Sequence, residues 1–423
     1  MSYNSIYVHI PFCESRCNYC DFVSHVKGEQ EDFAKIYADL VIAELKQQAN
    51  NQEEEIQTVY FGGGTPSVLP YQDVIKILNA IKETFKPAQD AEITIEVNPS
   101  STPYLPMFMY RKAGFNRISI GGQSFNDDEL AAMGRPHTAA DLIETIDSAE
   151  RAGFEHRNVD LIYGIPNQTL ESWLHSVEEA ARSKANHVSV YGLQVDNQSP
   201  WGKLFGAGKL QIADEDLAAD MFEQGTKLLK KDGFRHYEIA NFSYMLDDSD
   251  HTSRHNLAYW ARKNYLGLGL GAASCLDNKR WVNVGTLAEY AEALQKGQAP
   301  KRETEELTTN QVLSEAAFLA LRTTDGVEIE EYNKRYNVDF KKLFAAQIEK
   351  LLNQGLVEFG IKPKPMKEIP FPESPFPSTW DFTWGDNSGT VEEVPETPDI
   401  EVLRLTEKGI MLGNLVFEEF IIL

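Results

Sequence analysis

The chain lacks several features that would place it in a membrane or on nucleic acid. No run of about 18 apolar residues occurs, which excludes a spanning helix. Met1–Ser5 leads directly into an apolar strand-like run, Ile6–Ile10, without a leader-like charged segment. Cations are scarce, with 40 Lys and Arg against 64 Asp and Glu and a formal net charge of −24. Such a charge disfavours nucleic acid and anionic lipid as partners. We therefore expect a cytoplasmic protein with no integral membrane segment.

Cysteine is also rare, and its placement excludes a disulfide scaffold. Of four cysteines, Cys13, Cys17 and Cys20 lie within eight residues, and Cys275 stands alone as an expected small buried residue. Zinc sites usually use four ligands in two pairs, which the triplet lacks. A 4Fe–4S cluster held by three thiolates would leave one iron open for a small molecule that carries an amine and a carboxylate, such as S-adenosylmethionine. A structural zinc or a redox thiol cluster is the alternative.

Short β-branched runs alternate with helical segments over the first half of the chain. The predicted strands are Ser5–Ile10, Gln57–Phe61, Glu92–Val97, Arg117–Gly121, Val159–Tyr163 and His187–Gly192. The predicted helices are Gln30–Ala49, Tyr71–Phe85, Ala139–Ala152 and Leu170–Ser183. This alternation predicts a parallel sheet, arranged as a doubly wound sheet or an open barrel.

Glycine and polar clusters follow three of these strands. They are Gly62–Pro66, Glu96–Pro99 and Gly121–Ser124, and the cysteine triplet follows the first strand in the same way. Parallel α/β barrels place their sites at the carboxyl ends of the strands. We therefore expect one site built from several strand ends.

The pattern changes after residue 195. Asp214–Lys231 is predicted as a helix and Tyr237–Asn241 as a strand. Further helical segments are predicted at Asn310–Leu321, Glu328–Arg335, Phe340–Gln354, Val402–Leu415 and Val416–Leu423. We divide the chain into a core barrel (1–235), a barrel extension (236–300) and a mainly helical C-terminal domain (301–423).

Residues 363–398 interrupt the last domain with eight prolines. This density predicts an inserted loop, which either has no role or docks its aromatic side chains on the barrel or on a partner. Residues 301–423 also carry 23 acidic against 13 basic side chains, which disfavours nucleic-acid binding by this domain.

The motifs resemble those of the radical S-adenosylmethionine superfamily. The resemblance rests on Tyr7–Cys13, the cysteine triplet and Gly62–Pro66, and it narrows to the oxygen-independent coproporphyrinogen III oxidase-like subfamily through Glu96, Gly121–Phe125, Gly134–His137 and Asp160–Pro166. It implies a partial (β/α)6 barrel of the TIM type followed by a winged-helix-like domain, which Leu405–Ile410 resembles. It also implies a 4Fe–4S cluster and S-adenosylmethionine as cofactors.

The resemblance assigns roles to residues of this chain. Cys13, Cys17 and Cys20 would hold the cluster, Gly63 would receive the methionine amino group, and Glu96 the ribose hydroxyls. Tyr7 would lie against the adenosylmethionine. Positions that hold a second adenosylmethionine in the oxidases are matched by Tyr19, Gly64, Thr65, Gln123, Arg135 and Asp160.

Two features separate the branches of this subfamily. The cysteine motif of the oxidases is Cys-x3-Cys-x2-Cys-x-Cys, whereas this chain has Phe22 at the position of the last cysteine. His255, Asn256, Tyr259 and Trp260 resemble the HNxxYW motif of the haem-chaperone branch, where His255 would be an axial haem ligand. Two functions stay open: a haem carrier that delivers haem to a respiratory haemoprotein and forms a possible homodimer, and a porphyrinogen-decarboxylating oxidase of porphyrin biosynthesis.

Overall fold

The computed structural model describes residues 2–20, 24–26, 28, 30–49, 52, 54–99, 103–245, 249–362 and 399–422. Phe22 and the proline-rich segment 363–398 lie outside the described residues. The inserted loop predicted at residues 363–398 therefore stays a prediction. Among the described residues, no helix combines the length and the apolar character needed to cross a bilayer.

The centre of the fold is a curved sheet whose inner strands are parallel. Its order is β14-β13-β12-β11-β1-β4-β5-β6-β7-β8-β10-β9, and it remains open among the described residues. The parallel strands are β1 (Ser5–Ile10), β4 (Thr58–Gly63), β5 (Glu92–Val97), β6 (Arg117–Gln123), β7 (His156–Tyr163), β8 (His187–Gly192) and β11 (Tyr265–Leu268). The first six are the predicted strands, so the partial barrel is confirmed.

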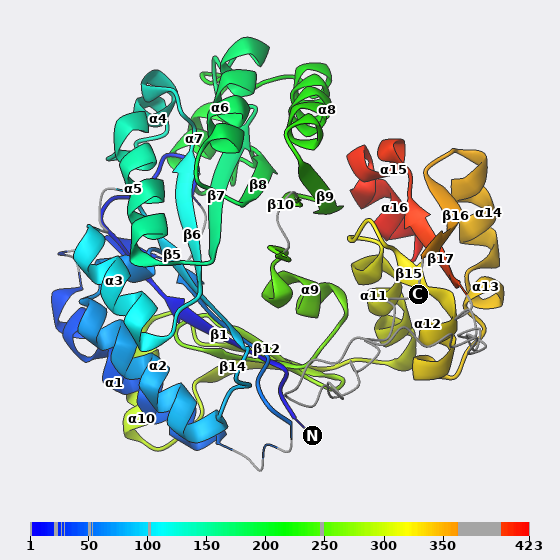
Figure 1. Cartoon of the computed structure of the whole chain (residues 1–423). Helices are drawn as coiled ribbons and strands as arrows, with labels where there is room; N and C mark the ends of the chain where they lie inside the picture. Colours follow the sequence, from blue (N-terminus) through cyan, green and yellow to red (C-terminus); the bar gives the residue numbers. More distant parts are fainter. Residues whose placement is uncertain are drawn as a thin grey trace, which may run out of the picture.

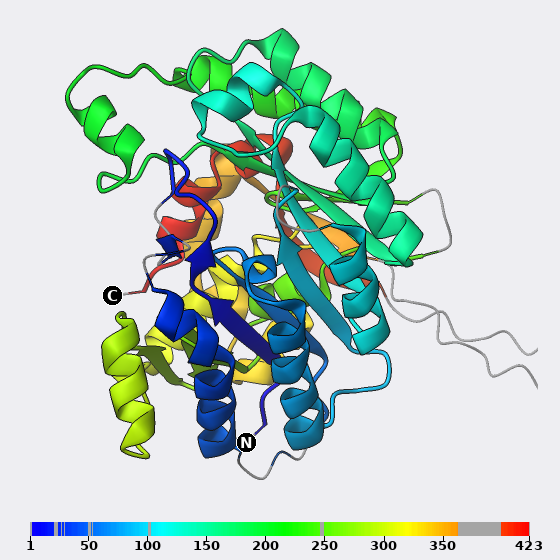
Figure 2. The same ribbon diagram turned by 90° about the vertical axis from the view of Figure 1, so that its left-hand side faces the viewer.

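Helices cover the outer face of this sheet, and their apolar sides pack on its buried strand residues (Figure 1). They include α1 (Glu31–Gln48), α2 (Tyr71–Phe85), α3 (Tyr104–Ala113), α5 (Ala139–Ala152), α6 (Leu170–Arg182) and α8 (Glu215–Lys231). Short elements connect them: β2 (Phe12–Cys13), β3 (His25–Val26), η1 (Pro66–Val68), α4 (Asp127–Ala132) and α7 (Pro200–Gly206). Figure 2 shows α7 projecting from the end of the barrel that carries the cysteine loop.

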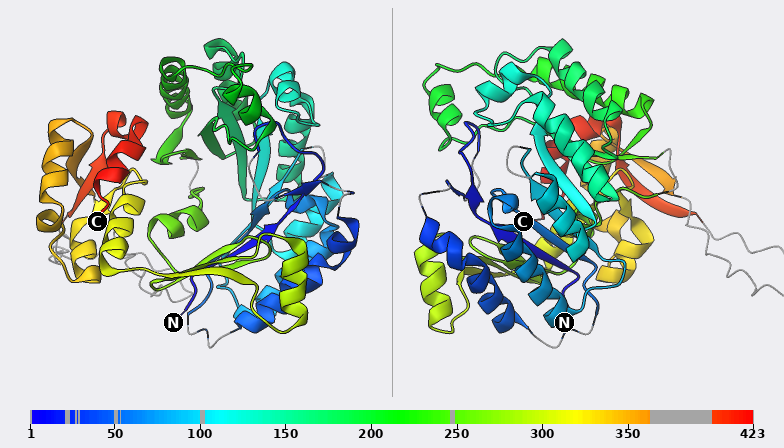
Figure 3. Two further views of the ribbon diagram at one scale, coloured as in Figure 1. Left: turned by 180° about the vertical axis from the view of Figure 1, so that it is seen from behind. Right: turned by 60° about the vertical axis from the view of Figure 1, so that its left-hand side comes forward.

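Antiparallel strands extend both edges of the sheet. One edge continues through β12 (Ala273–Leu276), β13 (Lys279–Asn283) and β14 (Lys301–Glu306), against which α10 (Leu287–Gln295) lies (Figure 3). The other edge is the hairpin β9 (Phe234–Glu238) and β10 (Asn241–Tyr244). The single strand predicted at Tyr237–Asn241 is therefore wrong, because the chain reverses between Glu238 and Asn241.

The C-terminal domain has its own apolar core around Phe340, Phe344 and Phe420. Its helices are α11 (Thr309–Ala320), α12 (Ile329–Tyr336), α13 (Phe340–Leu343), α14 (Ala345–Asn353), α15 (Glu407–Met411) and α16 (Gly413–Glu419). A small sheet joins β15 (Val327–Glu328), β17 (Ile400–Leu405) and β16 (Val357–Lys362). The helix predicted from Val402 thus begins as a strand, because Val402, Leu403 and Leu405 are buried against this core.

One short helix lies on the inner side of the curved sheet. This helix, α9 (Arg254–Trp260), contains the HNxxYW motif and packs between β4 and α11 (Figure 1). It thereby joins the barrel to the C-terminal domain.

Candidate functional site

The cysteine loop follows β1 at the carboxyl end of the parallel strands. Cys13, Cys17 and Cys20 are half-buried and form no disulfide. Arg135 places Nη1 3.3 Å from the Sγ atom of Cys17, and the Thr65 hydroxyl lies 3.8 Å from that of Cys13. Burial raises the pKa of the Cys13 thiol, while hydrogen bonds from Thr65 and Ser24 oppose the rise. Three free thiols beside a guanidinium fit the negative charge of a thiolate-bound cluster.

No other metal centre competes with this loop among the described residues, where no three His, Cys, Asp or Glu side chains converge on a single ion. In a 4Fe–4S cluster each thiolate binds a different iron, so the sulfurs stand further apart than the ligands of one ion.

The glycine run packs directly against the cysteine loop. The peptide nitrogen of Gly64 donates to the carbonyl of Ile10 at 2.9 Å, and that of Thr65 to the carbonyl of Phe12 at 2.8 Å. A Cβ atom on Gly64 would lie 2.7 Å from the Phe12 carbonyl and 3.0 Å from Cys13 Sγ. Gly64 is thus required for the close approach of two loops, which positions the first cysteine.

Gly63 has a further constraint. Its φ of 112° disfavours any side chain, and a Cβ atom would meet the His9 imidazole at 2.6 Å. The sequence predicted glycine here to leave room for a ligand. In the structure, a side chain at this position would collide with the His9 ring.

Glu96 on β5 reaches the same glycine run. Its Oε2 accepts a hydrogen bond from the Gly63 peptide nitrogen at 3.2 Å, and its Oε1 accepts one from the Tyr60 hydroxyl at 2.6 Å. Burial, and to a lesser extent the charge of Asp160, raise the pKa of Glu96 to about 7 against the opposing effect of the two hydrogen bonds. Each carboxylate oxygen keeps acceptor capacity for a ribose hydroxyl.

Arg135 joins the ends of β5 and β6 to the cysteine loop. Besides its contact with Cys17, its Nη2 donates to Asn98 Oδ1 at 3.0 Å and to the Gly121 carbonyl at 2.7 Å. Gln123, at the end of β6, has a φ of 72° and lies beside Gly121. A guanidinium held by several neutral acceptors keeps its positive charge available to the site.

The remaining predicted residues line the same end of the barrel. Asp160 on β7 accepts hydrogen bonds from Asn158 at 2.8 Å and from Ser119 at 3.2 Å, and burial raises its pKa. The Tyr7 hydroxyl and His9 Nδ1 share a hydrogen bond of 3.1 Å. Tyr19 lies in the cysteine loop with its ring centroid 6.1 Å from that of Trp201. The structure brings all these residues together, and their individual ligand roles stay predictions.

Tyr60 was missed by the sequence analysis. Its ring centroid lies 6.1 Å from that of Tyr7, its partner across the β1–β4 register, and 4.9 Å from that of His255. Tyr60 therefore links the Glu96 carboxylate to helix α9. The available signal was strand alternation, which places Tyr60 on the same face as Thr58 and Gly62.

His255 lies deep in the barrel, apart from the cluster loop. Its side chain is almost fully buried, at 2% exposure. Nδ1 shares a hydrogen bond of 2.7 Å with Thr58 Oγ1, and Nε2 shares one of 3.1 Å with the Tyr259 hydroxyl. Burial lowers the pKa of His255 to about 4, so the ring is neutral. Neither nitrogen is available to an iron in this conformation.

A buried ion pair fixes the start of α9. Arg117 Nε lies 2.9 Å from Glu92 Oε2, and both side chains are 3% exposed. Glu92 also accepts from the peptide nitrogens of Arg254 at 3.0 Å and His255 at 2.9 Å, while Arg117 donates to the carbonyls of His251 and Thr252. A carboxylate at the helix N-terminus is favourable because the first peptide nitrogens lack helical partners.

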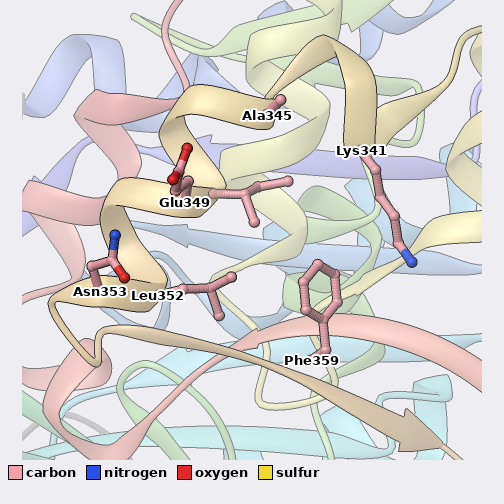
Figure 4. A pocket seen from close by; sticks show the side chains of 7 residues that line it. Lys341, Ala345, Glu349, Leu352, Asn353 and Phe359 are labelled. Carbon is pink, nitrogen blue, oxygen red and sulfur yellow. The ribbon is translucent and has the colours of Figure 1, made fainter.

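The described residues also form a groove on the C-terminal domain, which Figure 4 shows from close by. It measures about 270 Å³ and is lined by Lys341, Ala345, Ile348, Glu349, Leu352, Asn353 and Phe359. Lys341 is paired with Glu401 and lies over the Phe359 ring. The groove contains no motif residue, so we assign it no role in the chemistry.

The parallel barrel, the glycine run and the three-cysteine loop together define a radical S-adenosylmethionine protein. The Radical SAM superfamily model matches residues 7–180, and the HemN C-terminal domain model matches residues 307–360. Haem chaperone HemW of Lactococcus lactis is 32% identical over 99% of this chain and 97% of its own length, and HemW of Bacillus subtilis is 33% identical over 84% and 92%. The chain belongs to the HemW family.

A solved structure shows the same fold. Coproporphyrinogen III oxidase (HemN) from Escherichia coli matches with a TM-score of 0.77 at 21% identity, covering 99% of this chain and 90% of that one. The match extends through the barrel and the C-terminal domain, which confirms the predicted architecture. Radical SAM proteins use a 4Fe–4S cluster and S-adenosylmethionine, so both predicted cofactors are supported by the family.

We expect Cys13→Ser, Cys17→Ser and Cys20→Ser each to lose the cluster. Wild-type protein reconstituted without oxygen should contain about four irons per chain, and each variant should fall close to zero because a serine hydroxyl is a poor iron ligand. Iron and sulfide analysis with visible absorption measures this. Cys275→Ser is the matched control, since Cys275 is buried against the barrel extension. Cluster loss in that control would contradict the ligand assignment.

Proposed function

We propose that the protein is a haem chaperone that binds haem, carries a 4Fe–4S cluster with S-adenosylmethionine, and passes haem to a haem-accepting respiratory protein. The observation that carries this proposal is the near-complete match to a relative named as a haem chaperone. The HNxxYW motif on α9 supports it. Phe22 supports it too, because the motif of the oxidases has a further cysteine at this position.

The site can perform the cofactor part of this function with residues of this chain. Cys13, Cys17 and Cys20 would hold the cluster, Arg135 would compensate its negative charge, and Glu96 would orient the ribose. When bound, the cluster supplies an electron that cleaves the sulfonium of S-adenosylmethionine. The strand-end residues would hold S-adenosylmethionine beside the cysteine loop.

Ligation of haem iron by His255 remains a prediction. It requires the imidazole to exchange one of its two hydrogen bonds for iron and to become accessible from its present 2% exposure. Exchange of the bond to Thr58 would remove a contact between α9 and β4, whereas the bond to Tyr259 lies within α9 and its loss leaves that contact in place.

One experiment distinguishes the chaperone from the oxidase. Cluster-reconstituted protein is titrated with haem without oxygen, mixed with an apo-haemoprotein, and separately incubated with coproporphyrinogen III, S-adenosylmethionine and a reductant. We expect about one haem per chain, transfer to the acceptor, and no decarboxylated product. Turnover of coproporphyrinogen III by protein that does not retain haem would overturn the proposal. Light scattering of the same samples tests the predicted homodimer.

A further inference from the structure

A second cavity lies where α9 meets the C-terminal domain. It measures about 380 Å³, within the range of small-molecule sites. Its walls come from the last turn of α9, from α11 and α12, and from β9 and β15 of two different sheets. No predicted ligand of the cluster or of S-adenosylmethionine lines it. We name this cavity the α9 cleft.

The walls of the α9 cleft suit a flat apolar molecule. Trp260, Tyr332 and Tyr336 contribute aromatic rings, and Ala316 and Ala320 present a smooth surface of α11. Trp260, the last residue of the HNxxYW motif, is half-buried, and Arg322 lies 4.4 Å from the centre of its ring. Aromatic and small apolar side chains of this kind pack well against a planar ring system.

The charge of the cleft is opposite to that of the chain. Among its lining residues five are basic and three acidic, whereas the whole chain carries −24. Lys362 is paired with Asp325 and Glu328, and Arg262 with Glu315. Lys263 and Arg335 are exposed and have no carboxylate partner among the described residues. Arg335 is held in place by hydrogen bonds to the carbonyls of Ala261 and Arg262.

The HNxxYW motif is divided between two environments. His255 and Trp260 are five residues apart, which separates them by roughly 140° around a helix axis. His255 contacts Thr58 and Tyr60 inside the barrel, whereas Trp260 lines the α9 cleft. A ligand in the cleft would therefore pack on the tryptophan without reaching the imidazole.

We propose that the α9 cleft binds a tetrapyrrole dicarboxylate, with the macrocycle against Trp260 and the carboxylates at Lys263 and Arg335. This inference rests on the proposed chaperone function and locates its cargo. His255 is then a positioning residue that holds α9 on β4. Recognition depends on the ring and its carboxylates, so it does not require iron.

The test compares haem with metal-free protoporphyrin IX on full-length, cluster-reconstituted protein. Haem binding is measured by difference absorption and protoporphyrin IX binding by fluorescence. A competition experiment between the two tetrapyrroles then follows. If the cleft recognises the macrocycle and its carboxylates, the dissociation constants agree within about tenfold and the two compete. Raising the salt concentration weakens both, because the cationic side chains are exposed.

Variants locate the site. Lys263→Glu combined with Arg335→Gln, and separately Trp260→Leu, are each expected to weaken both tetrapyrroles by about tenfold or more. Lys209→Glu is the control for charge, since Lys209 is exposed on the loop after α7. Tyr104→Leu is the control for loss of an exposed ring. Unfolding curves of every variant identify any that fold poorly, and the variants at Lys263 and Trp260 must each stay folded to be compared.

The outcomes separate this inference from the proposed function. Wild-type protein that binds haem tightly, together with cleft variants of unchanged affinity and no competition by protoporphyrin IX, would overturn the cleft and leave the chaperone intact. A Soret band that shifts in His255→Ala but not in His175→Ala would then show that His255 is the haem ligand. Wild-type protein that binds neither tetrapyrrole would overturn the chaperone function itself.

Discussion

Arg117→Met is expected to lower the free energy of unfolding by about 3–5 kcal/mol, because it leaves the Glu92 carboxylate buried without a cation. Both partners are 3% exposed, so water cannot replace the lost interaction. Urea unfolding of the cofactor-free protein measures the change. Lys76→Met is the matched control, since Lys76 pairs with Asp39 on the surface and exposed pairs contribute below about 1 kcal/mol. Equal effects of the two substitutions would refute the assigned role of the buried pair.

The same variant is expected to loosen α9 more than the rest of the barrel. Glu92 accepts the peptide nitrogens of Arg254 and His255, and Arg117 holds the segment before the helix. Amide exchange should therefore accelerate at residues 254–260 before it accelerates in β1 or β4. Uniform acceleration would show that the pair stabilises the sheet without a particular effect on α9.

The second large effect is expected at Glu96. Glu96 is predicted to accept two charge-assisted hydrogen bonds from the ribose, each contributing roughly 1.5–3 kcal/mol, and Glu96→Ala would remove both. The affinity for S-adenosylmethionine should fall by about a hundredfold or more. Equilibrium binding to reconstituted protein measures it, and the cluster content must match the wild type. Unchanged affinity with an intact cluster would remove Glu96 from the site.

This affinity should also depend on pH with a defined sign. Because the pKa of Glu96 is raised to about 7, the carboxylate is charged above that pH and protonated below it. Only the charged form accepts both hydroxyl hydrogens, so affinity should be constant above about pH 8 and fall as the pH drops through 7. Glu96→Gln keeps the shape without the titration and should lose this dependence. A pH profile that is identical in both proteins would contradict this interpretation.

The sequence predicted the barrel well because its signals are local. Strand periodicity located β1, β5 and β8 at their observed bounds, and glycine clusters marked the strand ends that carry the site. The three cysteines and the strand-end segments that contain Gly63 and Glu96 stood out in the sequence for the same reason, since a loop at a strand end shows its chemistry in a few consecutive residues. The ligand roles of these residues stay predictions.

Long-range pairs were not predictable in this way. Glu92 and Arg117 each looked like an ordinary strand residue, and their shared role depends on α9, which is some 140 residues further along the chain. His255 was predicted from a motif that states residue types without stating which side of the helix faces the barrel. The hairpin at β9 and β10 was read as one strand because no Asn-Gly or Asp-Gly turn marks the reversal.

The position of β1 in the sheet has a consequence for synthesis of the chain. β1 pairs with β4 on one side and with β11 on the other, so its second neighbour is made about 255 residues after it. At a translation rate of roughly 5–20 residues per second, one side of β1 waits on the order of 10–50 s for its partner. The cysteines that follow β1 leave the ribosome early in this interval. The cysteine loop is therefore made well before β11, and β1, the strand that leads into this loop, stays paired on one side only until β11 is made.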